Sequence, residues 1–183
     1  TARRAELQAE LTAAQRRLGE LRSQAWPLVQ SGKTGTPAAS PDLCWTFEQG
    51  LKDEIRGLDL VPAGGPLLAA GRLKLDGIDD RARSAPVPFP LGARTLEAWV
   101  LLEGLEQRGG SALTVESENG EVFDALVFGE RVPRRWMAGS EFFRRTRDMD
   151  VADETASPQE PVHVAVVYDA AGTVRLYRQG RPY

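Results

Sequence analysis

The strongest alternation of apolar and polar positions lies in residues 94–102. One side of an extended segment would carry four apolar residues, namely Leu96, Ala98, Val100 and Leu102. The other side would carry Trp99, away from that apolar row. Side chains of a strand point alternately to its two faces, so this pattern predicts the central strand of an antiparallel sandwich. Its inner face would lie in the core, and Trp99 would face a second environment.

Residues 1–30 follow a different period. Apolar residues recur at alternating spacings of four and three, at Leu7, Leu11, Ala14, Leu18, Leu21, Ala25 and Leu28. This spacing predicts an α-helix, which Pro27 ends or kinks. Two interpretations stay open. The helix packs on its own or a neighbouring domain, or it self-associates as a coiled coil and makes the protein a homo-oligomer.

Residues 31–42 are rich in Gly, Ser and Pro and are interpreted as a linker. Short strands separated by turns follow in residues 43–183, and no helical crossover interrupts them. The expected strands are residues 44–48, 72–77, 94–102, 113–118, 121–128, 162–168 and 173–177. Asn119-Gly120 predicts a type I′ hairpin turn, the proline-rich residues 85–90 predict an edge or loop, and residues 129–161 predict a long irregular segment. The fold class is therefore all-β, a sandwich preceded by a helix.

The composition excludes several classes of function. The formal net charge is −3, with 42% hydrophobic and 27% charged residues, so global electrostatics gives no case for nucleic acid or an acidic membrane surface. No apolar run is long enough to span a membrane. Cys44 is the single cysteine, which excludes an internal disulfide and a paired-cysteine zinc site. Because the chain begins inside a charged helix, we interpret it as a piece of a longer protein.

Arginine and aromatic side chains gather in residues 130–150. Six arginines stand against four acids there, a local balance of +2. Arginine forks and aromatic faces suit an anionic or sulfated glycan, so the tentative ligand contacts are Trp99, Arg131, Arg134, Arg135, Trp136 and Arg144. The alternative is a long loop that ion pairs hold in place, or an interface with neighbouring domains. His163, the single histidine, lies in an alternating segment and is interpreted as a structural or sheet-surface residue.

Several segments together resemble laminin-G-like domains of the concanavalin A-like lectin/glucanase superfamily. They are residues 45–48, 71–77, 95–100, 162–168 and 174–180. Residues 123–130 and 136–140 resemble the copy embedded in large bacterial multidomain proteins beside a c-type cytochrome domain. The resemblance covers residues 43–183 and implies a two-sheet jelly roll. Family members continue past the equivalent of residues 179–180, so the resemblance also implies that this sandwich lacks its last strands.

The resemblance raises two further sites. Laminin-G-like domains often bind Ca²⁺ at a sandwich rim, which makes Asp76 and Asp79, near Asp80, tentative calcium ligands; the alternative is a solvated turn. The superfamily's glucanases place carboxylates at a spacing like that of Glu116, Glu118 and Glu121. Here Asn119-Gly120 would break the strand between them and splay them around a solvated tip, so we expect no enzyme.

The expected function is a non-catalytic recognition module that binds carbohydrate, including anionic polysaccharide, within a larger exported bacterial protein. Periplasmic or cell-surface localisation is implied by the resemblance alone. The alternative is a structural domain that docks on neighbouring domains of the same polypeptide, or self-associates through the helix, and binds no glycan.

Overall fold

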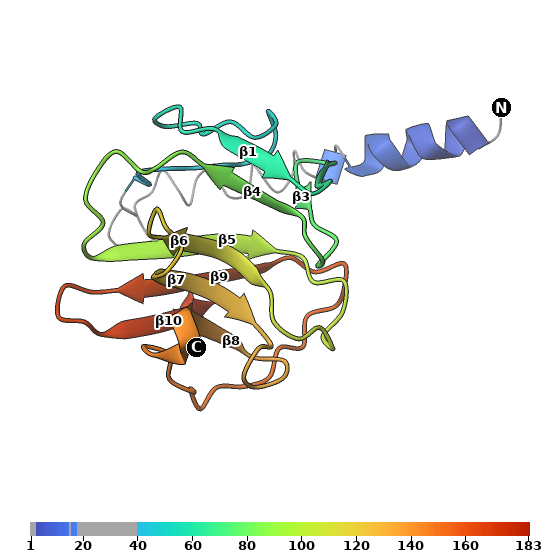
Figure 1. Ribbon diagram of the computed structural model, residues 1–183. Helices are drawn as coiled ribbons and strands as arrows, with labels where there is room; N and C mark the ends of the chain where they lie inside the picture. Colours follow the sequence, from blue (N-terminus) through green and yellow to red (C-terminus); the bar gives the residue numbers. More distant parts are fainter. Residues whose placement is uncertain (1–2, 15, 18–39) are drawn as a thin grey trace, which may run out of the picture. The chain divides into compact units, whose positions relative to one another are not determined.

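A computed structural model describes residues 3–14, 16–17 and 40–183 (Figure 1). The chain falls into two compact units, each treated by itself below. The first comprises residues 1–44 and 54–56, and the second residues 45–53 and 57–183. None of the described residues forms a helix long and apolar enough to cross a membrane.

The first unit contains the predicted helix. Residues 3–14 and 16–17 are helical, in a sequence rich in the strong helix formers Ala, Leu, Glu, Gln and Arg. Arg3 pairs with Glu6 at 2.9 Å. Leu7 and Leu11 are 48% and 51% exposed. Four seam positions, namely Leu18, Leu21, Ala25 and Leu28, lie outside the described residues with most of the predicted linker. Self-association therefore stays a prediction.

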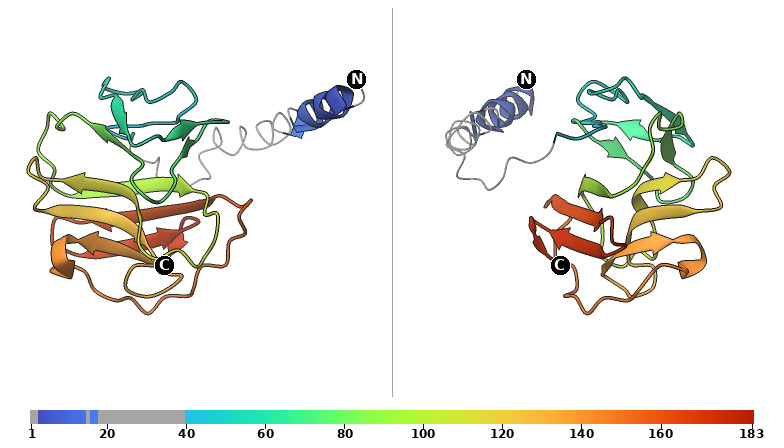
Figure 2. Two further views of the ribbon diagram at one scale, coloured as in Figure 1. Left: turned by 45° about the vertical axis from the view of Figure 1, so that its right-hand side comes forward. Right: turned by 90° about the vertical axis from the view of Figure 1, so that its left-hand side faces the viewer.

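The second unit is built from antiparallel sheets (Figure 2). The strand bounds are β1 Leu60–Ala63, β2 Leu67–Leu68, β3 Leu73–Lys74, β4 Arg81–Ser84, β5 Arg94–Val100, β6 Ser111–Glu116, β7 Phe123–Phe128, β8 Trp136–Ser140, β9 Val162–Tyr168, β10 Val174–Arg178 and β11 Arg181–Pro182. A four-stranded sheet has the order β11-β10-β9-β5, and a three-stranded sheet the order β6-β7-β8. Two smaller sheets pair β1 with β4 and β2 with β3. The predicted all-β fold class, with a helix before it, is confirmed.

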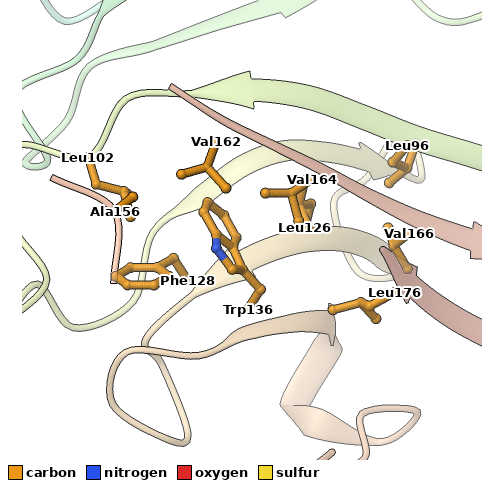
Figure 3. Close-up of a cluster of buried hydrophobic side chains, with 10 residues drawn as sticks. All are labelled: Leu96, Leu102, Leu126, Phe128, Trp136, Ala156, Val162, Val164, Val166 and Leu176. Atoms are coloured by element: carbon orange, nitrogen blue, oxygen red, sulfur yellow. The ribbon is translucent and has the colours of Figure 1, made fainter. Parts of the chain in front are cut away.

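The core joins the four-stranded and three-stranded sheets (Figure 3). The first contributes Leu96, Val162, Val164, Val166 and Leu176, and the second contributes Leu126, Phe128 and Trp136. These side chains come from alternate strand positions, so each strand turns one face to this core. The other face of β7 and β8 is buried as well, since Ala125, Val127 and Met137 form a second apolar cluster there. Burying each large apolar side chain stabilises the fold by roughly 1.5–3 kcal/mol.

Two strand predictions are wrong in detail. Residues 44–48 form no strand, because the chain bends there and Phe47 adopts a φ of +63°. Strand β5 is not central: it ends the order β11-β10-β9-β5, and β9 lies between two partners. The alternation within β5 is as predicted, since it depends on which face is buried and not on how many neighbours a strand has.

Two loop predictions also need correction. Residues 129–161 are not irregular throughout, because β8 lies within them and pairs with β7. The predicted hairpin between β6 and β7 exists, but its turn is not type I′. That turn needs positive φ at both central residues, whereas of the pair Asn119-Gly120 only Gly120 has it, at +72°. The turn closes through a 2.8 Å bond from the Gly120 N–H to the Ser117 carbonyl.

A buried carboxylate fastens the loop before β9 to both sheets. Glu154 is 1% exposed. It accepts hydrogen bonds from Arg178 on β10 at 2.5 and 2.8 Å and from the Trp136 indole on β8 at 2.9 Å. The backbone N–H groups of Thr155 and Ala156 also donate to it. Burial by itself raises the pKa of Glu154, but these donors outweigh burial and lower that pKa to about 2.

We expect Leu126→Ala to lower the free energy of unfolding by roughly 2–5 kcal/mol, because Leu126 is fully buried and a cavity would remain. Urea denaturation measures the change. Leu68→Ala is the matched control, since Leu68 is 46% exposed, and it should cost less than about 1 kcal/mol. Equal losses in the two variants would contradict the proposed core.

Glu154 should make stability depend on pH. Its folded-state pKa is depressed from 4.5 to about 2, so its contribution of about 3 kcal/mol is present above pH 4.5 and lost as pH falls towards 2. Glu154→Gln should destabilise the protein at pH 7 and flatten the stability curve in that window. The control is Asp148→Asn, which removes an exposed ion pair. An unchanged curve in the Glu154 variant would refute this assignment.

Candidate functional site

An aromatic and polar surface lies on the outward face of β5 and β9. We call it the Trp99 face and define it by Glu97, Trp99 and His163. Trp99 is 69% exposed and lies directly opposite His163 in the strand register. Their ring centroids are 5.0 Å apart at an interplanar angle of 45°. The His163 Nε2 atom lies 2.9 Å from a Glu97 carboxylate oxygen.

This face can hold a ligand without a cavity. The indole presents a large apolar surface on a rigid strand, suited to the C–H face of a sugar ring. The imidazole and the carboxylate fix one another beside it and offer hydrogen-bonding groups for hydroxyls. The expected sheet-surface position of His163 agrees with this placement. Glu97 was not among the predicted contacts, although it shares the outward phase of Trp99.

Three of the predicted arginine contacts are bound in ion pairs. Arg131 makes a fork to Asp148 at 2.6 and 2.8 Å, and this hydrogen bonding lowers the pKa of Asp148. Arg134 pairs with Glu106. Arg135 pairs with Asp153 at 2.9 Å. These contacts agree with the alternative prediction, a loop held by ion pairs. The three guanidinium groups already have carboxylate partners.

Arg144 differs from those three. It is exposed and makes no ion pair with any described residue; its guanidinium lies 5.7 Å from the centre of the Phe142 ring. Phe142 is itself 85% exposed. Of the four predicted arginines, Arg144 is the one whose charge is available to a ligand.

Trp136 requires a correction. It is 1% exposed, and its ring stacks at 4.9 Å on Phe128 inside the core. Its indole N–H is taken by Glu154. The local sequence groups Trp136 with arginines, but its position at the start of β8 turns it inward. It is therefore a core residue and is no longer counted among the candidate contacts.

The predicted contacts do not come together as one site. Trp99 lies on the outer face of the four-stranded sheet, whereas Arg131, Arg135 and Arg144 flank β8 of the other sheet. A recess beside Arg131, Arg135 and Met149 has a volume of about 10 Å³, which is the room of a single water molecule. It does not admit a sugar.

The predicted calcium ligands Asp76 and Asp79 lie in a turn in which the carboxylates of Asp76 and Asp80 already accept hydrogen bonds. Asp76 Oδ1 accepts bonds from the N–H groups of Ile78, Asp79 and Asp80 at 2.8, 3.3 and 3.4 Å. The bond from Ile78 contributes most to lowering the pKa of Asp76. Asp80 in turn accepts from the N–H groups of Asp76 and Gly65. One carboxylate oxygen of each of the three aspartates lies within 4.8 Å of the others, so the geometry accommodates both a capped turn and a hard cation.

The three hairpin carboxylates make no catalytic pair with one another. Glu116 pairs with Arg83 at 2.8 Å, and Glu121 accepts a bond from the Asn119 amide at 2.7 Å. Glu118 is exposed in the turn. A retaining glycosidase needs two carboxyl groups flanking one bond, with one of them held protonated by its surroundings. The three carboxylates lie at the end of β6 and in the exposed turn that follows it.

We expect calcium to leave the melting temperature unchanged, because backbone N–H groups already satisfy the Asp76 carboxylate. Thermal denaturation with added Ca²⁺ and with chelator measures this. Asp79→Asn serves as the matched variant, since Asp79 is exposed and its loss should leave the turn intact. A calcium-dependent rise that disappears in Asp79→Asn would establish the metal site instead.

Residues 76–183 match the laminin G family described as the concanavalin A-like lectin/glucanases superfamily. A search of curated proteins and a search of solved structures found no significant match. The matched segment covers 108 of 183 residues (76 to 183 inclusive) and contains β4 to β11, hence both sheets of the core. The chain therefore belongs to the concanavalin A-like lectin/glucanases superfamily.

Proposed function

We propose that this domain is a non-catalytic carbohydrate-binding module and that the Trp99 face is its ligand platform. The observation that carries the proposal is the exposure of Trp99, 69%, on a strand whose other face lies in the core. An exposed indole on a rigid strand offers a large, flat apolar surface to a partner. Membership of a lectin superfamily supports a sugar as that partner, but by fold analogy alone.

The arrangement favours a neutral glycan over an anionic one. Glu97 contributes a carboxylate to the Trp99 face, and three of the four candidate arginines are already paired. Of the four candidate arginines, Arg144 is the one that could pair with a sulfate group.

A structural role is the second candidate. Large apolar side chains are exposed around the two small sheets, at Val61 (67%), Leu67 (63%), Leu68 (46%) and Ile78 (87%). Such groups mark surfaces that other protein domains cover. In this alternative, neighbouring domains of the same polypeptide dock there, or the helix self-associates through Leu7 and Leu11, and no glycan binds.

We also propose that the domain lies outside the cytoplasm. Residues 123–130 and 136–140 resemble the copy found in large bacterial proteins that also contain a c-type cytochrome domain. Such a context would place the domain outside the cytoplasm, in the periplasm or on the cell surface. The helix at residues 3–14 and 16–17 would then act as a spacer between modules.

We expect Trp99→Ala to lower glycan affinity at least tenfold and to leave the melting temperature unchanged, because the side chain is mostly exposed. A glycan array with neutral and sulfated polysaccharides would find the ligand, and calorimetry would measure the affinities. Ile78→Ala removes another exposed apolar side chain, 87% exposed, away from the Trp99 face, and this variant should bind normally. An array without any wild-type signal would favour the structural role.

A further inference from the structure

Two adjacent phenylalanines project from the turn after β8. The 3-10 helix η1, Glu141–Phe143, follows directly on Trp136–Ser140. Phe142 is 85% exposed and Phe143 39% exposed. Both adopt left-handed backbone conformations, with φ of +47° and +56°. Figure 2 shows this orange segment at the periphery of the sandwich.

The left-handed region is unfavourable for bulky side chains, so the surrounding structure must hold it. The Ser140 hydroxyl accepts a bond from the Arg145 N–H at 2.9 Å, and the Thr146 hydroxyl donates to the Ala138 carbonyl at 3.0 Å. The Arg145 guanidinium binds the buried Glu141 at 2.6 Å. It also reaches Asp124 on β7 at 3.0 Å. The turn is thereby fixed to the three-stranded sheet, with the Phe142 ring largely exposed and the Arg131 guanidinium 5.0 Å from the centre of the Phe143 ring.

The charge around this turn is cationic at its tip. Arg145 is neutralised by Glu141 and Asp124, and Arg131 by Asp148. Arg144 and Arg147 are exposed and form no ion pair with any described residue. Glu130 lies in the field of Arg131 and Asp150 in that of Arg135, so both acids act on arginines that already have a carboxylate partner. Two apolar rings and Arg144 thus share one turn, and Arg147 follows four residues after Phe143. We call this segment the Phe142 tip and define it by Phe142, Phe143, Arg144 and Arg147.

We infer that the Phe142 tip binds the surface of an anionic lipid bilayer. Aromatic rings enter the boundary between headgroups and acyl chains, and adjacent arginines remain at the level of anionic headgroups. A protein partner would need a pocket shaped for a protruding pair of rings, whereas a fluid bilayer closes around any protrusion. Arg144 packs on Phe142, so ring and charge approach the surface together.

The protein has a net charge of −3, so the whole molecule is not attracted to an anionic bilayer. Attraction comes from the tip and not from the whole protein, so binding is weak, reversible and sensitive to salt. It is independent of the Trp99 face, which lies on the other sheet. A module that holds a glycan with one face and a membrane with its tip would sit at a cell surface.

Vesicle flotation of the whole chain tests the inference. The probes are vesicles of phosphatidylcholine alone and of phosphatidylcholine with 30 mol% phosphatidylglycerol. Wild-type protein should float with the anionic vesicles at low salt. Phe142→Ser combined with Phe143→Ser should reduce binding about tenfold, and Arg144→Gln with Arg147→Gln by a similar factor. All of these side chains are exposed, so melting temperatures should not change.

Matched controls separate the tip from general surface effects. Ile78→Ser removes another exposed apolar side chain, and Arg72→Gln with Arg108→Gln removes two exposed charges elsewhere; both should bind like wild type. In Phe142→Trp, lipids brominated on their acyl chains should quench the added fluorescence. The inference is overturned if wild-type protein stays with the unbound fraction, or if the controls lose as much binding as the tip variants. Tip-dependent retention on heparin without vesicle binding would likewise overturn it, in favour of an anionic glycan.

Discussion

The sandwich depends on how the Glu154 carboxylate is satisfied inside it. A buried charge without partners would destabilise the fold strongly. Here one carboxylate accepts from the guanidinium on β10, the indole on β8 and two N–H groups of its own loop. It therefore joins the two sheets at one end and positions the segment that precedes β9. Because loss of Glu154 would remove the shared acceptor of Arg178 and Trp136, this carboxylate holds β8, β10 and that segment together.

This constraint separates the residues that maintain the fold from those that can serve function. Trp136 stays inside because its N–H is needed by Glu154, and three nearby arginines stay in place because each has its own carboxylate. Among the side chains left exposed are Trp99 on the outward face of β5 and Phe142 in the turn after β8. The two proposals rest on these two surfaces, while the scaffold is that of a superfamily of lectins and glucanases.

The spacing of apolar residues and the residue types in the turns predicted much of the architecture. The alternation in β5 and the outward direction of Trp99 both follow from a strand having two faces. The first strand at residues 44–48 was wrong because an apolar, aromatic run also fits a bent segment packed by its side chains. β8 was missed because arginines beside Trp136 and Met137 mask a buried strand, whose neighbours across the sheet are distant in sequence.

By itself the sequence determined the all-β class, the helix before it and which face of β5 is buried, because these depend on local periodicity. Tertiary structure alone decided that β5 lies at the edge of its sheet and β9 inside it. It also decided that Trp136 is a core residue, that Arg131, Arg134 and Arg135 are paired, and that Phe142 is exposed. Each of these outcomes depends on a partner far along the chain, such as Glu154 for Trp136 or Glu106 for Arg134. A residue's own neighbours in sequence carry no information about such a partner.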